Sequence, residues 1–256
     1  MLNLVKDYDA SKKIILNQSI DGYDKVCFST NEDLLSCLKN LKIFQKNVLS
    51  VMGSCDQVFT FNYFGANVDS FDKNILSLYY YYLRRWNILY GEDVYPTDLI
   101  NNSYFDLSMI LNKVRPSTDE ENTALHFWEK HINEKTDFSK LFFHMDVMGN
   151  TIFTEREDLL GTVKKEPNFI NIDLFKPVII NKKYEIIYLS NIIEWSRNRK
   201  DILLVLRDNL DNLLDKNGII ICTNIANNND EIEKLVFSEK FDITEKNRFS
   251  YRYVKK

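Results

Sequence analysis

Short apolar runs that alternate with helical patterns constrain the fold of this 256-residue chain more than any other feature. Apolar runs of about four to eight residues, bounded by turn residues, are typical of strands buried in a sheet. The predicted strands cover residues 47–52, 67–72, 168–173, 184–190 and 218–223, and two closing strands cover 241–244 and 249–254. The predicted helices cover residues 57–64, 74–89, 199–214 and 230–237. This alternation predicts an α/β protein with a mostly parallel sheet, in which the two closing strands pair antiparallel.

Turn and cap residues set the expected boundaries. Asp56 is placed to cap the helix over 57–64, and Gly65 is placed to end it through a left-handed residue. Residues 216–218, Lys-Asn-Gly, predict a turn before the last parallel strand. The basic pair Arg84-Arg85 is expected at the solvated surface of its helix.

A stretch of about 80 residues, 90–167, interrupts the alternation. A doubly wound sheet needs only a short connection there, so we expect a helical insertion between strands two and three, with helices over 118–134 and 154–164. The insertion would serve either as a structural cap or as the wall of a substrate pocket. Residues 1–45 are expected to form an N-terminal helical cap, with helical character over 31–41, and residues 46–256 the α/β domain.

Composition excludes several functions. A net charge of −4 argues against nonspecific binding of nucleic acid, which needs clustered cations. Four cysteines without a CxxC pair, and only three histidines, offer no zinc set of the usual spacing. No apolar run approaches the roughly 18 residues of a membrane span, and the N-terminus lacks the apolar core of a signal peptide. We therefore expect a cytoplasmic protein with reduced thiols and no metal site.

Three acids follow predicted strands at the edge where open α/β sheets bind their ligands. They are Asp56, Asp72 and Asp173. Asp72 lies 19 residues after Gly53, the spacing from which an acid binds the ribose hydroxyls in nucleotide-binding βαβ units. This pattern predicts a nucleoside-containing ligand at the carboxyl ends of the strands.

The loop after the first strand narrows the choice of cofactor. It contains Gly53 but no complete GxGxxG, which disfavours the close approach of a pyrophosphate and hence NAD or FAD. A cofactor without phosphate tolerates Ser54 and Cys55 better. S-adenosyl-L-methionine (SAM) is the predicted cofactor, and the closing antiparallel strands also suit a SAM-dependent methyltransferase sheet.

Three motifs carry a resemblance to a known group of proteins. They are Cys55-Asp56-Gln57, Asp72-Lys73-Asn74 and residues 189–195, Leu-Ser-Asn-Ile-Ile-Glu-Trp. Together they resemble the class I SAM-dependent methyltransferase superfamily, in particular the SAM:diacylglycerol 3-amino-3-carboxypropyltransferases of betaine-lipid synthesis and a set of uncharacterised bacterial proteins. The resemblance covers about residues 47–90 and 168–223. Met52 and Cys55 stand where that family has glycines, and Ile75 stands where it has proline.

The resemblance implies a Rossmann-like class I methyltransferase fold and a role for each site residue. Backbone groups of residues 52–54 would line the methionine part of SAM, Asp72 would hold the ribose, and Asp173 would reach the adenine. The implied cofactor-binding residues are Met52, Gly53, Ser54, Asp56, Asp72, Lys73, Asn74, Asp173 and Leu174. The implied catalytic residues, facing the sulfonium or the acceptor, are Ser190, Asn191 and Glu194.

Three functions stay open from the sequence. Methyl transfer and 3-amino-3-carboxypropyl transfer from SAM would use the same cofactor site, on a small-molecule or lipid-like acceptor. A non-catalytic module that binds SAM or a nucleotide is the third. Asn191 is not followed by Pro-Pro, so the signature of DNA base-amino methyltransferases is missing.

Overall fold

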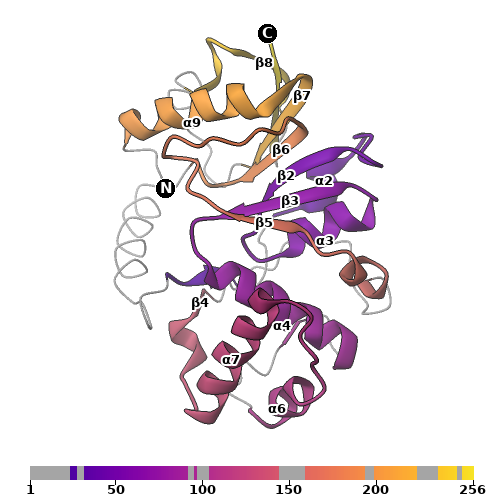
Figure 1. Ribbon diagram of the computed structural model, residues 1–256. Helices are drawn as coiled ribbons and strands as arrows, with labels where there is room; N and C mark the ends of the chain where they lie inside the picture. The colour runs from indigo at the N-terminus through magenta and orange to yellow at the C-terminus, as the bar shows by residue number, and fades with distance from the viewer. Residues whose placement is uncertain are drawn as a thin grey trace, which may run out of the picture.

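The main sheet of the computed structural model has seven strands within the described residues, in the order β5-β3-β2-β6-β7-β9-β8 (Figure 1). The described residues are 24–27, 32–91, 95–96, 104–143, 159–193, 199–223, 236–246 and 250–256. The strands are β2 (Asn47–Val51), β3 (Asn67–Asp72), β5 (Asn168–Asn171), β6 (Tyr184–Ser190), β7 (Leu214–Thr223), β8 (Phe241–Lys246) and β9 (Ser250–Lys255). The predicted strands are therefore confirmed, most of them to within one or two residues.

The strand order confirms the Rossmann-like class I methyltransferase fold. Strand β2 pairs parallel with both β3 and β6, β3 pairs parallel with β5, and β6 with β7. Strand β9 is antiparallel to both β7 and β8, as predicted. The chain builds outward from β2 through β3 to β5 and then returns to the other side of β2 at β6. Strand order therefore reverses between β2 and β6, and the carboxyl ends of these two strands flank the switch point.

The helices α3 (Asp56–Tyr63), α4 (Leu76–Tyr90) and α9 (Lys200–Leu213) connect the strands. Helix α3 is buried at seven of its eight residues and α4 over most of its length, whereas α9 is amphipathic. The buried positions of α9 include Leu203, Leu206, Leu210 and Leu213, the spacing of one helix face. In Figure 1, α9 lies at the upper end of the molecule beside β7 and β8, and α4 lies at the lower end.

The segment between β3 and β5 is mainly helical in its described part and contains the predicted helix over 118–134. Helices α6 (Phe105–Leu111) and α7 (Asp119–Asn133) gather with α4 at the lower end of the molecule (Figure 1). The Trp128 indole of α7 donates to the Tyr79 carbonyl of α4 at 2.8 Å. The 3-10 helices η1 (Phe138–Lys140) and η2 (Thr162–Lys164) follow. Residues 154–158 of the predicted helix over 154–164 lie outside the described residues, as do residues 230–235 of the one over 230–237.

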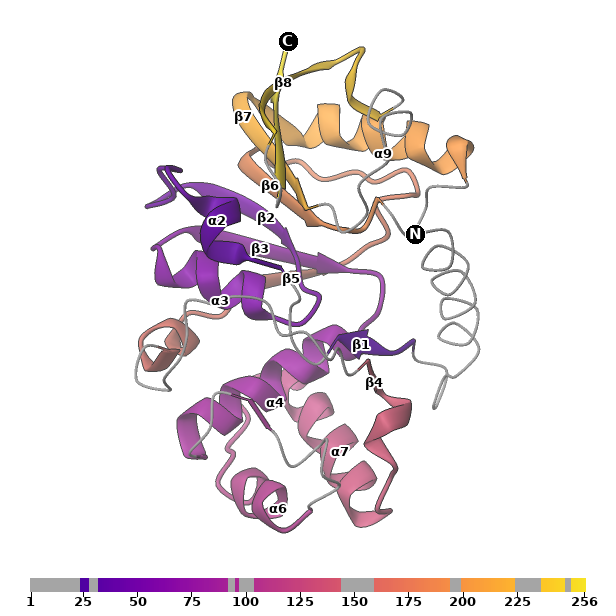
Figure 2. The same cartoon turned by 180° about the vertical axis from the view of Figure 1, so that it is seen from behind.

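The N-terminal segment connects the insertion to the sheet. Strand β1 (Val26–Cys27) pairs parallel with β4 (Phe142–Phe143) beside α4 (Figure 2). Helix α2 (Leu34–Leu38) is shorter than the predicted 31–41 and is capped by Asp33, which accepts from the Ser36 amide at 3.1 Å. Arg252 of β9 donates to the carbonyls of Cys37 and Lys39, which holds the end of α2 near that strand.

Strand β7 differs from the sequence prediction. The expected turn at 216–218 lies inside the strand, where pairing with β6 skips from Leu214 opposite Tyr184 to Ile219 opposite Ile186. Five residue steps along β7 thus face only two along β6, so residues 216–218 bulge out of the ladder and Gly218 lies against the Leu214 side chain. Among the described residues, none of the helices combines the length and apolarity needed to span a membrane.

Candidate functional site

The loop that follows β2 turns sharply at two residues with left-handed backbone angles. Gly53 has φ 48° and Cys55, the residue before α3, has φ 73°. Cys55 makes no side-chain capping bond to α3, and its amide donates to the Met52 carbonyl at 2.7 Å. Met52, Ser54 and Cys55 are buried. Three of the predicted cofactor-binding residues, Met52, Gly53 and Ser54, thus lie together at the carboxyl end of the central strand, as the sequence implied.

A buried ion pair between Asp56 and Arg84 fixes the shape of this loop through hydrogen bonds to Ser54. Asp56 is the first residue of α3, not the cap before it. Its Oδ1 accepts from Arg84 Nη1 at 2.8 Å and from the Tyr95 hydroxyl at 2.9 Å, while Oδ2 accepts from Ser54 Oγ at 2.8 Å. Arg84 Nη1 also donates to the Ser54 carbonyl at 2.8 Å. The Asp56 side chain is therefore committed to holding the loop in shape.

The expectation that Arg84 lies at the surface is wrong, because its guanidinium is fully buried. The ring centroids of Tyr95 and Phe59 lie 4.2 Å and 5.0 Å from Arg84 Cζ, which gives the cation two aromatic faces. Burial lowers the pKa of Arg84, but the negative charge of Asp56 together with the neighbouring Tyr95, Tyr80 and Cys55 raises it above the ordinary value. Arg84 stays a cation, and its charge balances that of Asp56.

Asp72 ends β3 and faces the loop after β2. Its Oδ1 accepts from the Asn74 amide at 2.9 Å, and its Oδ2 accepts from Ser77 Oγ at 2.8 Å. Burial raises the pKa of this carboxyl, and hydrogen bonds from Asn74, Ser77 and the Gly53 amide oppose the rise without cancelling it. A carboxylate offers about four acceptor positions, so these three donors leave room for a ligand hydroxyl.

Lys73 and Asn74, which follow Asp72, contact the N-terminal segment. Asn74 Nδ2 donates to the Asp24 carbonyl at 2.7 Å, and Lys73 Nζ lies 3.7 Å from the Asp24 carboxylate. Asp24 precedes β1, so the N-terminal segment passes the carboxyl end of β3. These two predicted cofactor-binding residues therefore form a contact between the strand end and the segment beside it.

Asp173 and Leu174 close the turn after β5. Asp173 Oδ1 accepts from the Phe175 amide at 3.0 Å. Leu174 is buried, and its carbonyl accepts from Asn209 of α9 at 2.8 Å. Because β5 pairs with β3, this turn lies at the same edge of the sheet as Asp72.

A second cluster centres on Glu32, a residue that sequence reasoning did not assign to the site. Glu32 lies just before α2, and its carboxylate receives four side-chain donors. Gln57 Nε2 and the Tyr188 hydroxyl donate to Oε2 at 3.1 Å and 2.9 Å, while Ser190 and Thr223 donate to Oε1, the latter at 2.5 Å. These donors come from the first turn of α3 and from the ends of β6 and β7. The Glu32 carboxylate therefore receives donors from both sides of the switch point, from the helix after β2 and from the ends of β6 and β7.

Ser190 and Asn191 occupy the end of β6 as expected. Ser190 has φ 54°, an uncommon angle for a residue with a side chain, and strand pairing with β7 is irregular between Tyr188 and Ser190. Its Oγ lies 3.4 Å from Asn191 Oδ1. Glu194, the third predicted catalytic residue, lies outside the described residues.

Cys27 of β1 is close enough to Glu32, Asp72 and Asp56 for their charges to act on its thiol. Burial raises the pKa of its thiol to about 12, and the negative charges of Glu32, Asp72 and Asp56 act in the same direction. The thiol is therefore neutral at physiological pH and is not poised as a nucleophile. Within the described ranges, no group of three histidine, cysteine or acidic side chains is arranged to hold a metal ion.

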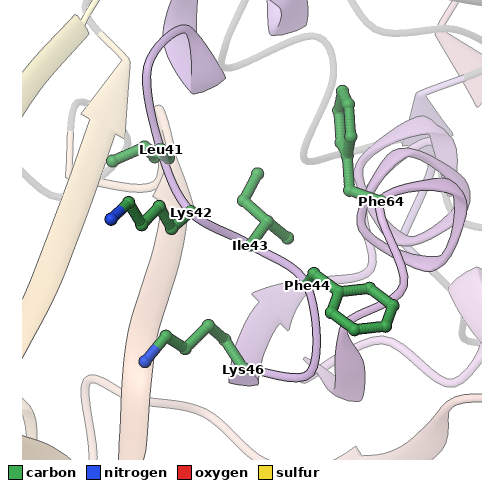
Figure 3. A pocket seen from close by; sticks show the side chains of 6 residues that line it. All are labelled: Leu41, Lys42, Ile43, Phe44, Lys46 and Phe64. Carbon is green, nitrogen blue, oxygen red and sulfur yellow. The ribbon is translucent and has the colours of Figure 1, made fainter.

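A pocket of about 540 Å³ lies at the opposite end of β2 (Figure 3). It is lined by Leu41, Lys42, Ile43, Phe44, Lys46 and Phe64. Lys46 directly precedes β2 and pairs with Glu185 at 2.5 Å, whereas the acids of the candidate site follow the carboxyl ends of the strands. This pocket is therefore separate from the candidate site.

The strand order and the polar strand-end loops place this chain among the α/β proteins with a class I methyltransferase fold. No family model matches the sequence, and no curated protein matches it either. Solved structures resemble the fold at low sequence identity.

A TehB-like SAM-dependent methyltransferase from Corynebacterium glutamicum is 10% identical over the full length of both chains, with a TM-score of 0.44. A ribosomal protein L11 methylase from Lactobacillus delbrueckii is 13% identical over 87% of this chain and 76% of its own, with a TM-score of 0.39. The N-methyltransferase NodS from Bradyrhizobium japonicum, in complex with S-adenosyl-L-homocysteine, is 6% identical over 87% and 83%, also with a TM-score of 0.39. The fold class rests on the strand order itself.

Proposed function

We propose that this protein is a SAM-dependent transferase that binds its cofactor across the carboxyl ends of β2, β3 and β5. One observation carries the proposal: Asp72 ends β3 beside the loop after β2, where the Met52 amide donates to the Phe71 carbonyl at 2.8 Å, next to the point where strand order reverses. Open α/β sheets bind nucleoside ligands at this place. An acid that keeps acceptor positions there suits ribose hydroxyls.

Each site residue is assigned to one part of the cofactor, in order along the edge of the sheet. Asp72 accepts from the ribose, and the backbone of residues 52–54 runs beside the methionine part of the cofactor. Asp173 and Leu174, at the end of β5, lie on the adenine side. Asp56 and Arg84 hold the loop in one shape, because their charged groups form hydrogen bonds with each other and with Ser54. Lys73 and Asn74 flank the ribose and connect it to the N-terminal segment.

The reacting end of the cofactor faces β6. Ser190 and Asn191 would position the acceptor against the sulfonium, with Glu194 as the third residue of this set. Positioning accounts for most of the catalysis in such a transfer, and a base is needed only when the acceptor arrives protonated. A small-molecule or lipid-like acceptor is the class we propose.

Transfer of the 3-amino-3-carboxypropyl group is the second candidate reaction. The resemblance of the Cys55-Asp56-Gln57, Asp72-Lys73-Asn74 and 189–195 motifs to the aminocarboxypropyltransferases favours it. The two reactions use one cofactor site and differ in which carbon of the sulfonium the acceptor attacks. A non-catalytic SAM-binding role is the remaining alternative.

Calorimetry and product analysis test these proposals together. We expect S-adenosyl-L-homocysteine to bind the folded protein with measurable heat, and an absence of heat at millimolar ligand would remove the cofactor assignment. Incubation with SAM and cell extract, followed by mass spectrometry, then separates the reactions. S-adenosyl-L-homocysteine as product indicates methyl transfer, methylthioadenosine indicates aminocarboxypropyl transfer, and binding without either product indicates a non-catalytic module.

A further inference from the structure

Glu32 joins three segments that are far apart in the sequence. It lies 25 residues from Gln57, 158 from Ser190 and 191 from Thr223. Its side chain and the four donor side chains are all buried, with Glu32 5% exposed. The N-terminal segment therefore places one carboxylate at the ends of β6 and β7, the side of the switch point away from the proposed ribose and adenine positions.

We propose that Glu32 is a specificity-determining positioning residue, which makes the acceptor end of the site select a cationic, hydrogen-donating group such as an amine. The inference rests on the proposed function only in naming this group as the acceptor. The charge selectivity itself follows from the Glu32 cluster.

The directions of the hydrogen bonds carry the argument. An ionised carboxylate has no hydrogen, so each of its contacts must be donated by the partner. A hydroxyl has one hydrogen, so Tyr188, Ser190 and Thr223 spend theirs on Glu32. Burial raises the pKa of Tyr188 well above its ordinary value, and Glu32 raises it further, so this hydroxyl keeps its proton. All three oxygens then offer only lone pairs to any other group.

Backbone geometry marks the same place. Ser190 adopts a left-handed angle next to an irregularity in the pairing of β6 with β7. Such angles cost free energy and cluster at functional sites, and such irregularities re-aim side chains beside them. Ser190 and Thr223 keep 7% and 6% of their surfaces exposed, whereas Tyr188 is fully buried, so these two residues lie at the boundary of the cluster.

A surface of lone pairs backed by a negative charge has a clear preference. It attracts ammonium and other N–H donors and repels carboxylates and phosphates, because an anion there would find neither a hydrogen nor an opposite charge. An amine that donates its N–H groups to Ser190 and Thr223 keeps its nitrogen lone pair for the sulfonium carbon. Glu32 acts through the hydroxyls, and for this reason we class it as a positioning residue.

The charge of Glu32 also suits the transfer step. An ammonium that binds here first gives one proton to water. The resulting neutral amine forms the new C–N bond while the C–S bond breaks, and the electron pair of that bond stays on sulfur as a neutral thioether. Positive charge thus moves from sulfur to nitrogen, and the product ammonium gives its extra proton to water. A fixed negative charge near the nitrogen stabilises the charge that develops there.

The test compares two probes of equal chain length, n-butylammonium and butyrate, by their effect on the melting temperature of the protein. Wild type saturated with S-adenosyl-L-homocysteine should be stabilised by butylammonium and not by butyrate. Glu32→Gln should weaken the response to butylammonium by roughly tenfold in apparent affinity, since a charge-assisted interaction is lost. Its affinity for S-adenosyl-L-homocysteine should stay within about twofold of wild type.

Glu121→Gln is the matched control, because Glu121 is also buried but bonds Trp86, Ser117 and Arg85 away from the strand ends. It should keep the preference for butylammonium. If Glu32→Gln does not fold, Ser190→Ala and Thr223→Ala each remove one acceptor oxygen and should weaken the same response several-fold.

The proposal is overturned by wild type that ignores butylammonium, by wild type that prefers butyrate, or by variants that keep the wild-type preference. Failure of the cofactor assignment is a separate result. Protein that does not bind S-adenosyl-L-homocysteine is measured with the two probes alone, and the charge preference is then decided without the cofactor.

Discussion

Arg84 and Asp56 form an ion pair of 2.8 Å in which the side chains are 0% and 1% exposed. The pair connects the middle of α4 to the first residue of α3. Through the Ser54 carbonyl and hydroxyl it also fixes the loop along which the cofactor is proposed to bind. The shape of that loop therefore depends on a helix that begins after the next strand.

We predict that Arg84→Met strongly destabilises the protein. Removing one partner of a buried ion pair leaves the other charge unpaired in a dry environment, which costs about 3–5 kcal/mol. Urea denaturation of the purified variant measures the free energy of unfolding. Arg199→Met is the control, because Arg199 pairs with Asp201 at the surface, and we expect it to unfold like wild type. Equal effects of the two substitutions would contradict the structural importance of the buried pair.

We predict that Asp72→Ala weakens the binding of S-adenosyl-L-homocysteine by at least about tenfold. A carboxylate that accepts from ribose hydroxyls makes charge-assisted hydrogen bonds, worth roughly 1.5–3 kcal/mol each. Calorimetry gives the dissociation constant, and a thermal melt shows how far the variant stays folded. A lower melting temperature with an unchanged dissociation constant would mean that Asp72 serves only the turn that it forms with Asn74 and Ser77.

The raised pKa of Asp72 predicts a pH dependence. A buried carboxyl gains its proton at a pH above 3.8, the ordinary value, so it loses charge on acidification before an exposed aspartate does. We expect affinity for S-adenosyl-L-homocysteine to fall in that range as the pH is lowered. Asp72→Asn should bind weakly with a flatter pH profile. An identical profile in both proteins would exclude Asp72 as the titrating group.

The raised pKa of Asp72 also predicts how the free energy of unfolding changes with pH. The folded state holds the Asp72 proton more tightly than the unfolded chain, so this group favours folding at low pH. That contribution is lost as the pH rises through the raised pKa. Urea denaturation of wild type and Asp72→Asn across this range should therefore diverge as the pH increases, with wild type losing stability relative to the variant.

We predict that Asn191→Ala and Glu194→Gln lower turnover by roughly 10²-fold or more with nearly unchanged cofactor affinity. That size is expected when positioning or general-base assistance at the reacting atom is lost. The turnover is measured as the rate at which product forms from SAM when cell extract supplies the acceptor. Calorimetry gives the affinity for S-adenosyl-L-homocysteine. A lower melting temperature with turnover per folded molecule retained would take these residues out of the active site.

Local patterns predicted the strands and helices well, because each is encoded by the periodicity of its own residues. Strands β3 and β6 match their predicted ranges, and Gly65 has the left-handed φ of 75° that its place after α3 required. The turn signal at 216–218 marks a bulge inside β7 and not the start of the strand, because Leu214 already pairs with Tyr184 of β6. Pairing with a neighbouring strand thus extended β7 beyond the boundary that the local signal indicated.

Long-range contacts explain what sequence reasoning missed. Glu32 lies among residues 1–45, where no site residue was expected, and its four donors become neighbours only when β6 and β7 lie beside β2. Arg84 was expected at the surface because it belongs to a basic pair, but its partner Asp56 lies 28 residues away in the sequence, at the start of α3. Both contacts depend on the assembled sheet.

The position of β2 also affects how the chain folds during synthesis. Its second neighbour is β6, and the Asn47 amide donates to Glu185, 138 residues further along. On the ribosome, the central strand is therefore half-paired until the whole insertion and β6 have been made. Such a distant pairing is slow to form and leaves an apolar strand edge open to other chains. Slowing translation beyond residue 190 should therefore protect the nascent protein from aggregation, whereas a pause before β6 should promote it.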